Sequence, residues 1–285
     1  MYEMETPEVT DRRLKLELRL AQLDETKACR EDFIQYVKKV WPEFINGAHH
    51  TMIAKKFEDI ANGKIKRLII NMPPRHTKSE FASFLLPSWI IGRDPKTKII
   101  QTTHTAELAV NFGRKVRNLL DTPEYRTIFD GVRLQSDSKA AGRWSTNHGG
   151  EYFAAGVGGA ITGRGADLLI IDDPHSEQDA LSDTAMEHAY EWYTSGPRQR
   201  LQPGGAIVIV MTRWSLKDLT AKILKAQGYD DKADQWEVVE FPAIMPSGNP
   251  CWPEYWNKQE LDGVRASLSV AKWNAQWQQN PTSEE

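Results

Sequence analysis

The chain is poor in cysteine, in long apolar runs and in net charge, and each shortage excludes a class of protein. Among its 285 residues are two cysteines, Cys29 and Cys251, whose separation suggests neither a disulfide framework nor a zinc site, so a reducing compartment fits. No apolar run approaches the roughly 20 residues of a membrane span, and the charged N-terminus is unlike a secretory signal. The net charge of −3 does not indicate general affinity for nucleic acid, so any such role needs a local patch.

The overall composition is that of a globular protein, with 40% hydrophobic and 26% charged residues. Short apolar runs typical of buried strands alternate with helical patterns, which predicts an α/β fold with a mostly parallel sheet flanked by helices. The expected strands lie at 68–70, 98–103, 151–155, 167–173, 206–212 and 236–241. Ligands of such sheets bind at the carboxyl ends of the strands.

Three parts of the chain are expected. Residues 1–65 form a helical N-terminal region, with helices at 11–29, 31–40 and 49–61, and the first helix carries an apolar stripe through Leu14 and Leu18. Residues 66–245 form the core, in which the polar stretch 130–147 is irregular and Ser215 caps a helix. Residues 246–285 form a C-terminal segment with a short helix near its end.

The stretch Arg67 to Ala82, RLIINMPPRHTKSEFA, has the order strand, tight loop, Lys-Ser and helix. This is the layout of a phosphate-binding loop, in which Lys78 contacts the β- and γ-phosphates of ATP and the Ser79 hydroxyl ligates Mg²⁺. Met72 and Thr77 occupy the two positions that are usually glycine, and a β-branched residue such as Thr77 resists a positive φ. The alternative is a plain strand, turn and helix with a solvated lysine.

Other residues near this loop are candidates for contact with the nucleotide. Arg75 could contact phosphate, or pair with an acid when nucleotide is absent. A purine could stack on His49, whereas the alternative is a solvated pair, His49 and His50, at a helix start. Glu80 is expected to cap the helix or pair locally. The candidate nucleotide-binding residues are Pro74, Arg75, His76, Thr77, Lys78, Ser79, Glu80, His49 and Thr212.

Two adjacent carboxylates close the apolar strand at 167–173, and four apolar residues followed by an acid are typical of a Walker B motif. Asp172 would hold Mg²⁺, and Asp173 would polarise the attacking water. The alternative is a simple turn or helix cap before Pro174.

Two arginines are candidates for neutralising phosphate charge. Arg213 and its neighbour Thr212 follow the strand at 206–212, where they could sense the γ-phosphate; the alternative is a surface arginine stacked on Trp214. Arg164 lies on the glycine-rich loop 156–165, a few residues before the Asp172 strand, so we expect it near the same edge of the sheet. It could enter a neighbouring subunit's site as an arginine finger, or bind a nearby carboxylate.

With these motifs the chain resembles the ATPase domain of the large terminase subunit of tailed bacteriophages, the motor that packages DNA into a procapsid. The resemblance covers about residues 33–281 and rests on INMPPRHTKS, GAITGRGADLLIIDDP and MTRW. It implies a P-loop NTPase fold of the ASCE type, with Lys78 and Ser79 in Walker A and Arg164 as the trans-acting finger. It also implies that Asp172 and Asp173 form Walker B and that Thr212 and Arg213 form the coupling motif.

The resemblance further implies an ATPase that uses Mg²⁺ and moves double-stranded DNA, with Asp173, Lys78, Arg164 and Arg213 as catalytic residues. Implied partners are the small terminase subunit, the portal and procapsid, and further copies of the chain in a ring, a pentamer on the procapsid and a monomer alone. The implied location is the host cytoplasm, with no membrane contact. The ending WNAQWQQNP looks like the family's junction to a nuclease domain, so we expect a chain without that domain and without nuclease activity.

Other functions remain open at this point. One is a helicase-like or recombination P-loop ATPase acting on DNA, and another is a P-loop assembly protein that does not hydrolyse ATP. Basic groups at 64–67 and 114–117 are candidates for DNA contact, with solvated surface charges as the alternative.

Overall fold

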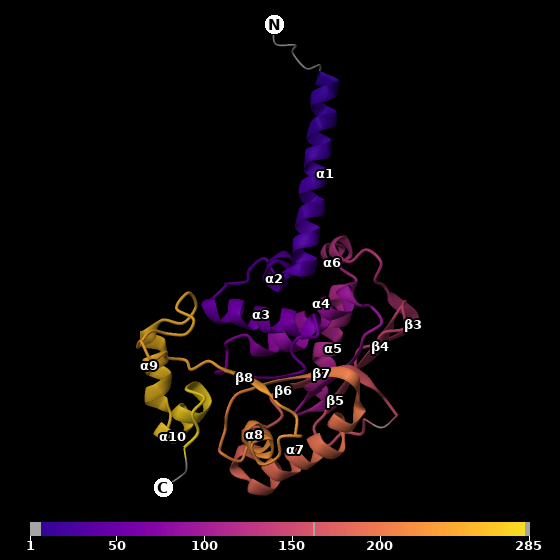
Figure 1. Ribbon diagram of the computed structural model, residues 1–285. Coiled ribbons are helices and arrows are strands. Elements are labelled where there is room, and N and C mark those ends of the chain that lie inside the picture. The colour runs from indigo at the N-terminus through magenta and orange to yellow at the C-terminus, as the bar shows by residue number, and fades with distance from the viewer. Residues whose placement is uncertain (1–6, 162, 283–285) are drawn as a thin grey trace.

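The computed structural model describes residues 7–161 and 163–282 (Figure 1). Within them, eight strands form one sheet in the order β3-β4-β5-β2-β6-β7-β1-β8. The strands are β1 (Arg67–Asn71), β2 (Lys98–Thr103), β3 (Leu134–Ala140), β4 (Arg143–Thr146), β5 (Glu151–Gly156), β6 (Ala166–Asp172), β7 (Leu201–Met211) and β8 (Glu237–Glu240).

The six strands from β5 to β8 in this order run parallel, and β3 and β4 pair antiparallel at one edge. The predicted mostly parallel sheet is therefore confirmed. The prediction of an irregular stretch at 130–147 is wrong, because that stretch holds β3 and β4. A strand at the edge of a sheet needs no continuous apolar face. The polar sequence LQSDSKA of β3 therefore gave no strand signal.

The helices cover both faces of the sheet (Figure 1). They are α1 (Pro7–Glu31), α2 (Phe33–Val40), α3 (Ala48–Ala61), α4 (Leu86–Arg93), α5 (Ala106–Leu120), α6 (Pro123–Ile128), α7 (Asp183–Ser195), α8 (Leu219–Tyr229), α9 (Lys258–Ser267) and α10 (Val270–Lys272). A π-helical turn, Glu80–Leu85, joins the loop after β1 to α4. The expected helix cap at Ser215 is wrong: α8 begins after Asp218, whose carboxylate accepts from the amide of Ala221 at 3.0 Å.

The core has two apolar clusters, one on each face of the sheet. Ile70 and Ile170 belong to the cluster that also contains residues of α2, α3, α4 and α5, whereas Ile69 and Ile171 belong to the cluster with residues of α7 and α8. Neighbouring residues of one strand point to opposite faces, so strands buried on both faces must be apolar throughout. This is why the central strands could be recognised in the sequence as unbroken apolar runs.

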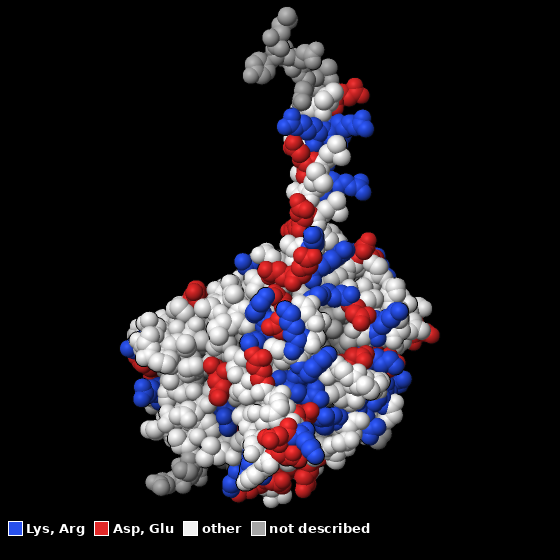
Figure 2. Space-filling model, viewed as in Figure 1, with Lys and Arg blue, Asp and Glu red and all other residues white. Residues whose placement is uncertain are grey.

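Helix α1 projects away from the rest of the molecule (Figures 1 and 2). Residues 8–25 are all exposed, and the expected apolar stripe remains in solvent, with Leu14 54% and Leu18 64% exposed. Only near its end does α1 join the core, through the buried Cys29. None of the described helices is both long enough and apolar enough to cross a bilayer.

The C-terminal segment packs beside the β8 edge of the sheet (Figure 1). It has its own small apolar cluster, made of Ala243, Leu261, Trp273 and Trp277. After this cluster the chain returns to the sheet, where Gln279 is buried against the residues that follow β7.

Candidate nucleotide-binding site

The segment between β1 and the π-helical turn forms a tight loop at the carboxyl edge of the sheet. Arg75 and Thr77 both have left-handed backbone conformations, with φ of 59° and 68°. Side chains with a Cβ avoid this region, β-branched ones most of all. Thr77 thus adopts the positive φ that would ordinarily call for glycine at this position.

Lys78 directly follows Thr77 in this loop and pairs with Asp173, the second of the two adjacent carboxylates. Its Nζ is 2.8 Å from Oδ2 of Asp173, and the lysine side chain is 9% exposed. Burial opposes the charged form of Lys78, but Asp173 and Asp172 together raise its pKa, so the lysine is charged. The other oxygen of Asp173 accepts from the amide of Thr212 at 2.9 Å. Asp173 therefore links the phosphate loop to the end of β7.

Asp172 is buried at the end of β6 and is held by two serines. Ser79 donates to Oδ1 at 2.9 Å and Ser83 donates to Oδ2 at 2.7 Å, while Gln101 donates to the Ser83 hydroxyl. Burial is the main cause that raises the pKa of Asp172 to about 7, with repulsion from Asp173 adding to it. Without bound nucleotide, the pKa of this carboxyl group therefore lies near neutral pH.

The pair of Ser79 and Asp172 fits a magnesium ion. A hydroxyl and a carboxylate oxygen 2.9 Å apart are hard oxygen donors of the kind that Mg²⁺ takes. Within residues 7–161 and 163–282, no three acidic, histidine or cysteine side chains gather in a way that could hold a metal. Mg²⁺ in nucleotide sites commonly takes one or two protein ligands and completes its shell with phosphate and water, so two donors are sufficient.

Ser83 and Gln101 were missed by sequence reasoning. Ser83 lies four residues after Ser79, and Gln101 is a polar residue inside the apolar strand β2, which is the signal that could have revealed it. Both are fully buried, and together they form the inner side of the Asp172 site.

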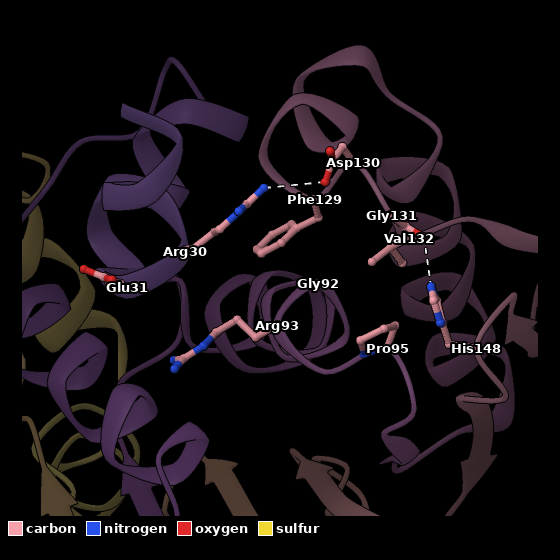
Figure 3. A pocket seen from close by; sticks show the side chains of 10 residues that line it. All are labelled: Arg30, Glu31, Gly92, Arg93, Pro95, Phe129, Asp130, Gly131, Val132 and His148. Carbon is pink, nitrogen blue, oxygen red and sulfur yellow. Dashed lines mark hydrogen bonds and ion pairs between the residues drawn. The ribbon is translucent and has the colours of Figure 1, made fainter. Parts of the chain in front are cut away.

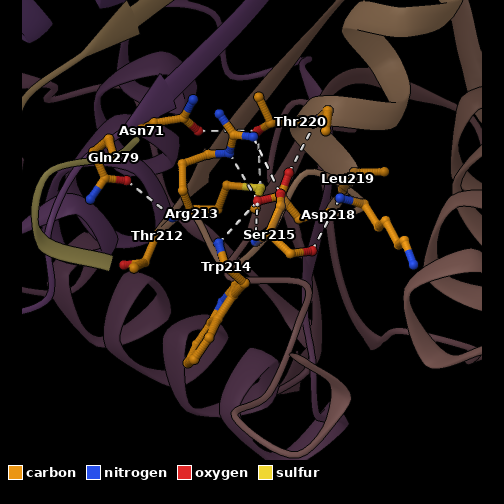
Figure 4. A network of polar contacts seen from close by, with 12 residues as sticks. Asn71, Thr212, Arg213, Trp214, Ser215, Asp218, Leu219, Thr220 and Gln279 are labelled. Atoms are coloured by element: carbon orange, nitrogen blue, oxygen red, sulfur yellow. Dashed lines mark hydrogen bonds and ion pairs between the residues drawn. The ribbon is translucent and has the colours of Figure 1, made fainter. Parts of the chain in front are cut away.

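Arg213 follows β7 as predicted, but its side chain is neither on the surface nor stacked on Trp214 (Figure 4). Its Nε is 2.9 Å from Oδ2 of Asp218, and both side chains are buried. The main-chain amide of Arg213 donates to Oε1 of Gln279 at 3.0 Å. The segment Thr212-Arg213 is thus tied to the C-terminal segment, and its role in coupling and in direct phosphate sensing stays a prediction.

Arg164 does not lie where we expected it. Its guanidinium covers the ring of Phe153 at 4.1 Å and lies 3.9 Å from a carboxylate oxygen of Glu151, the first residue of β5. This is the amino edge of the sheet, and the length of β6, about 20 Å, separates it from Asp172. The expectation that Arg164 lies near the carboxyl edge is wrong, because a whole strand intervenes. The alternative partner, a nearby carboxylate, is present, and action in trans stays a prediction.

His49 is not placed to stack on a purine. It is 2% exposed and packs against His50, Phe241 and Trp252, so the solvated pair is also wrong. Burial lowers the pKa of His49 to about 4 and keeps it neutral. Nothing in the sequence pattern distinguishes an exposed from a buried pair of histidines at a helix start.

The remaining residues of the loop differ in their partners and in their exposure. His76 is fully buried, with Nδ1 2.8 Å from the carbonyl oxygen of Pro74. Glu80 pairs with Lys115 of α5 at 3.0 Å, a partner 35 residues away and not the helix cap or local pair that we expected. Arg75 is exposed at the tip of the loop.

The basic groups proposed for DNA contact have polar partners close by. Lys64 lies 3.6 Å from Asp59, and Arg67 lies 3.1 Å from Asp234. Arg114 donates to Asn111 at 3.0 Å. DNA contact by these groups stays a prediction, and Arg67, whose side chain is 13% exposed, is not a solvated surface charge.

A cavity of about 440 Å³ lies elsewhere, between the ends of α1 and α4 and the loop after α6 (Figure 3). Arg30, Arg93 and Phe129 are among its lining residues. The Arg30 guanidinium is already engaged by the carbonyl oxygen of Ile128 and by Asp130. The cavity shares no residue with the phosphate loop and contributes nothing to the candidate site.

The loop, the two carboxylates and the sheet order define a P-loop nucleotide-binding fold. Comparison with solved structures defines this fold more closely. The large terminase of bacteriophage HK97 aligns with a TM-score of 0.54 and 14% identity, over 88% of this chain and 55% of that one. The large terminase ATPase domain of Thermus phage P74-26, in a mutant form, aligns with a TM-score of 0.53 and 14% identity, over 84% of this chain and 95% of that one.

The chain therefore has the fold of large terminase ATPase domains, as the sequence predicted, and it spans about half the length of the HK97 protein. No family model and no curated protein matches the sequence.

Proposed function

We propose that the chain is the ATP-hydrolysing part of a large terminase, a motor that moves double-stranded DNA into a procapsid. One observation carries the proposal: Lys78 meets Asp173, and Ser79 meets Asp172, where β1 and β6 end side by side with β7. A lysine, a hydroxyl and two carboxylates at the carboxyl edge of a parallel sheet form the apparatus of phosphoryl transfer to water.

Hydrolysis begins with an exchange of partners at Lys78. The ammonium group leaves Oδ2 of Asp173 for the phosphate oxygens of ATP, and the freed carboxylate orients the attacking water. Ser79 and Asp172 would hold Mg²⁺, which would supply positive charge at the β- and γ-phosphate oxygens. The Thr212 amide keeps Asp173 in place through its other oxygen, 2.9 Å away.

Release of phosphate lets Lys78 pair again with Asp173. Because Asp173 also holds the Thr212 amide, and the next amide, that of Arg213, holds Gln279, this exchange is transmitted to the C-terminal segment. The proposed motor thus converts the state of the nucleotide into a displacement of that segment, and so of bound DNA.

The cellular location and the partners of the motor are also proposed. The chain would act in the host cytoplasm as a ring of identical subunits on the portal of a procapsid, supplied with DNA by the small terminase subunit. In such a ring Arg164, far from its own Asp172, would serve a neighbour's site.

The test is ATP hydrolysis by the purified chain with Mg²⁺, with Lys78→Ala as the variant. Loss of the ammonium charge should reduce phosphate release by at least about 100-fold. A matched control is Lys55→Ala, which removes an exposed lysine of α3 that pairs with Glu58. Wild-type turnover in Lys78→Ala would refute the assignment of the phosphate loop.

Experiments on the same purified chain distinguish the proposal from two rival functions. No phosphate release from ATP by the wild-type chain would favour a P-loop assembly protein. Unwinding of forked DNA would favour a helicase-like ATPase, whereas stimulation of hydrolysis by a small terminase subunit or procapsid would favour packaging.

A further inference from the structure

Thr77 holds a backbone conformation that its own side chain disfavours. Its φ of 68° lies in the left-handed region, where a residue with a Cβ is disfavoured by roughly five- to thirtyfold in population. Thr77 directly precedes Lys78, so this conformation sets the direction of the phosphate-binding lysine. Strain of this kind persists only where the surroundings impose it.

The side chain of His50, in the first turn of α3, lies against the Thr77 hydroxyl. Its Nε2 is 2.7 Å from Oγ1, and its Nδ1 accepts from the amide of Gly47 at 2.8 Å. Because Nδ1 is an acceptor, the neutral ring carries its hydrogen on Nε2 and donates it to Thr77. The Thr77 hydroxyl in turn donates to the carbonyl oxygen of His76 at 2.5 Å. The His50 ring and the Thr77 hydroxyl thus each accept one hydrogen bond and donate one, and no two of these roles conflict.

His50 is fixed in place and has no charge. It is fully buried, and its ring centroid lies 4.8 Å from that of Phe44, 4.8 Å from that of Phe81 and 4.9 Å from that of Trp252. Burial is the main cause that lowers its pKa to about 2, so the ring stays neutral throughout the physiological range. A ring enclosed in this way cannot turn away from Thr77.

We propose that His50 is a positioning residue for the phosphate loop, and that the pair of His50 and Thr77 replaces the glycine usual at this point. His50 holds the Thr77 hydroxyl, the hydroxyl holds the His76 carbonyl, and the loop keeps the left-handed turn that directs Lys78. The inference rests on the proposed function in that the ligand is ATP. It makes α3, which precedes the sheet, part of the nucleotide site.

The experiment measures ATP affinity for His50→Ala in two backgrounds, wild type and Thr77→Gly. With Thr77 present, His50→Ala should weaken binding by roughly five- to thirtyfold, because the strained conformation loses its support. With glycine at that position the same change should cost at most about twofold, since glycine needs no support. His50→Gln, whose amide can donate in place of Nε2, should recover most of the lost affinity.

The matched control is His49→Ala. His49 is buried in the same turn, and no hydrogen bond joins its ring to the Thr77 hydroxyl, which His50 contacts instead. Its effect on affinity should be the same in both backgrounds. Equal effects of His50→Ala in both backgrounds would overturn the inference.

Urea unfolding of the same variants without nucleotide separates this inference from the proposed function. If the wild-type chain binds no ATP, the proposed function fails and unfolding alone decides about the pair. The effects of His50→Ala and Thr77→Gly on unfolding should then be non-additive, with a smaller loss for His50→Ala in the glycine background. Additive effects would overturn the pairing.

Discussion

Replacing Asp172 by Asn should stabilise the nucleotide-free protein, and the gain should grow with pH. The folded state raises the pKa of Asp172 to about 7, mainly by burial, from about 3.9 in an unfolded chain. A carboxyl group whose pKa is higher in the folded state stabilises the fold when protonated and loses that contribution as pH rises. By pH 5 the wild-type protein has lost a smaller part of this contribution, and by pH 8 the loss is on the order of 3–4 kcal/mol.

Asparagine does not titrate, so the stability of the variant relative to the wild type should rise by on the order of 2–3 kcal/mol between pH 5 and pH 8. One serine hydroxyl, that of Ser79 or Ser83, must turn to accept from the new amide group, which costs about 1 kcal/mol at every pH. The net gain at pH 8 is then about 2–3 kcal/mol. The assay is urea unfolding at pH 5, 6, 7 and 8 without nucleotide or divalent ions.

Asp218→Asn is the control of opposite sign. Asp218 is as deeply buried as Asp172, but its carboxylate is paired with Arg213 at 2.9 Å. Removing its charge leaves a buried guanidinium unpaired and should cost about 3–5 kcal/mol. Parallel stability curves for the wild type and Asp172→Asn over the whole pH range would refute the account of a buried, strained carboxylate.

The remaining predictions concern the chemistry. Asp172→Asn should weaken Mg²⁺-dependent ATP binding by at least about tenfold in a titration, because the metal loses an anionic ligand. Asp173→Asn should still bind ATP but not cleave it, and equal loss of binding in both variants would show that the two acids do not divide the roles. For Arg164, mixing Arg164→Ala with Lys78→Ala, each inactive alone, should restore partial ATP hydrolysis, since an intact lysine site then meets a neighbour's arginine. No recovery in mixtures shown to co-assemble would contradict action in trans.

The parts of the fold that could be predicted were the strands that form unbroken apolar runs and the helices whose apolar residues recur at helical spacing. Strands such as β6 and β7, buried on both faces, are unbroken apolar runs, and the polar residues at their carboxyl ends had to meet. That argument brings Lys78 and Asp172 to one edge of the sheet, but the structure was needed to show that Lys78 pairs with Asp173 and Ser79 with Asp172. The polar edge strands β3 and β4 carried no such signal.

The errors at the site have a common physical origin. Arg164 is close to Asp172 in sequence, but an extended strand separates its ends by about 3.3 Å per residue, so nearness along β6 means distance in space. For His49 and His50, burial depends on rings from distant segments, among them Phe81 and Trp252, which no local pattern reveals. Asp218, the partner of Arg213, was not identified from the sequence, which pointed to Ser215 as the helix cap instead.

The projecting part of α1 has a practical consequence for handling the protein. The helix is about 38 Å long, and residues 8–25 bury nothing against the body, so cutting there removes no core contact. Most helical stability in proteins comes from tertiary packing, so this unsupported stretch opens readily in water, and Arg12, Lys15 and Arg19 lie in it. Limited trypsin digestion should therefore shorten the chain at α1 first and leave the urea midpoint of the remaining body unchanged. Any molecule that covers the exposed leucines would slow this cleavage, which makes the lifetime of the Arg19 site a direct measure of occupancy on the helix.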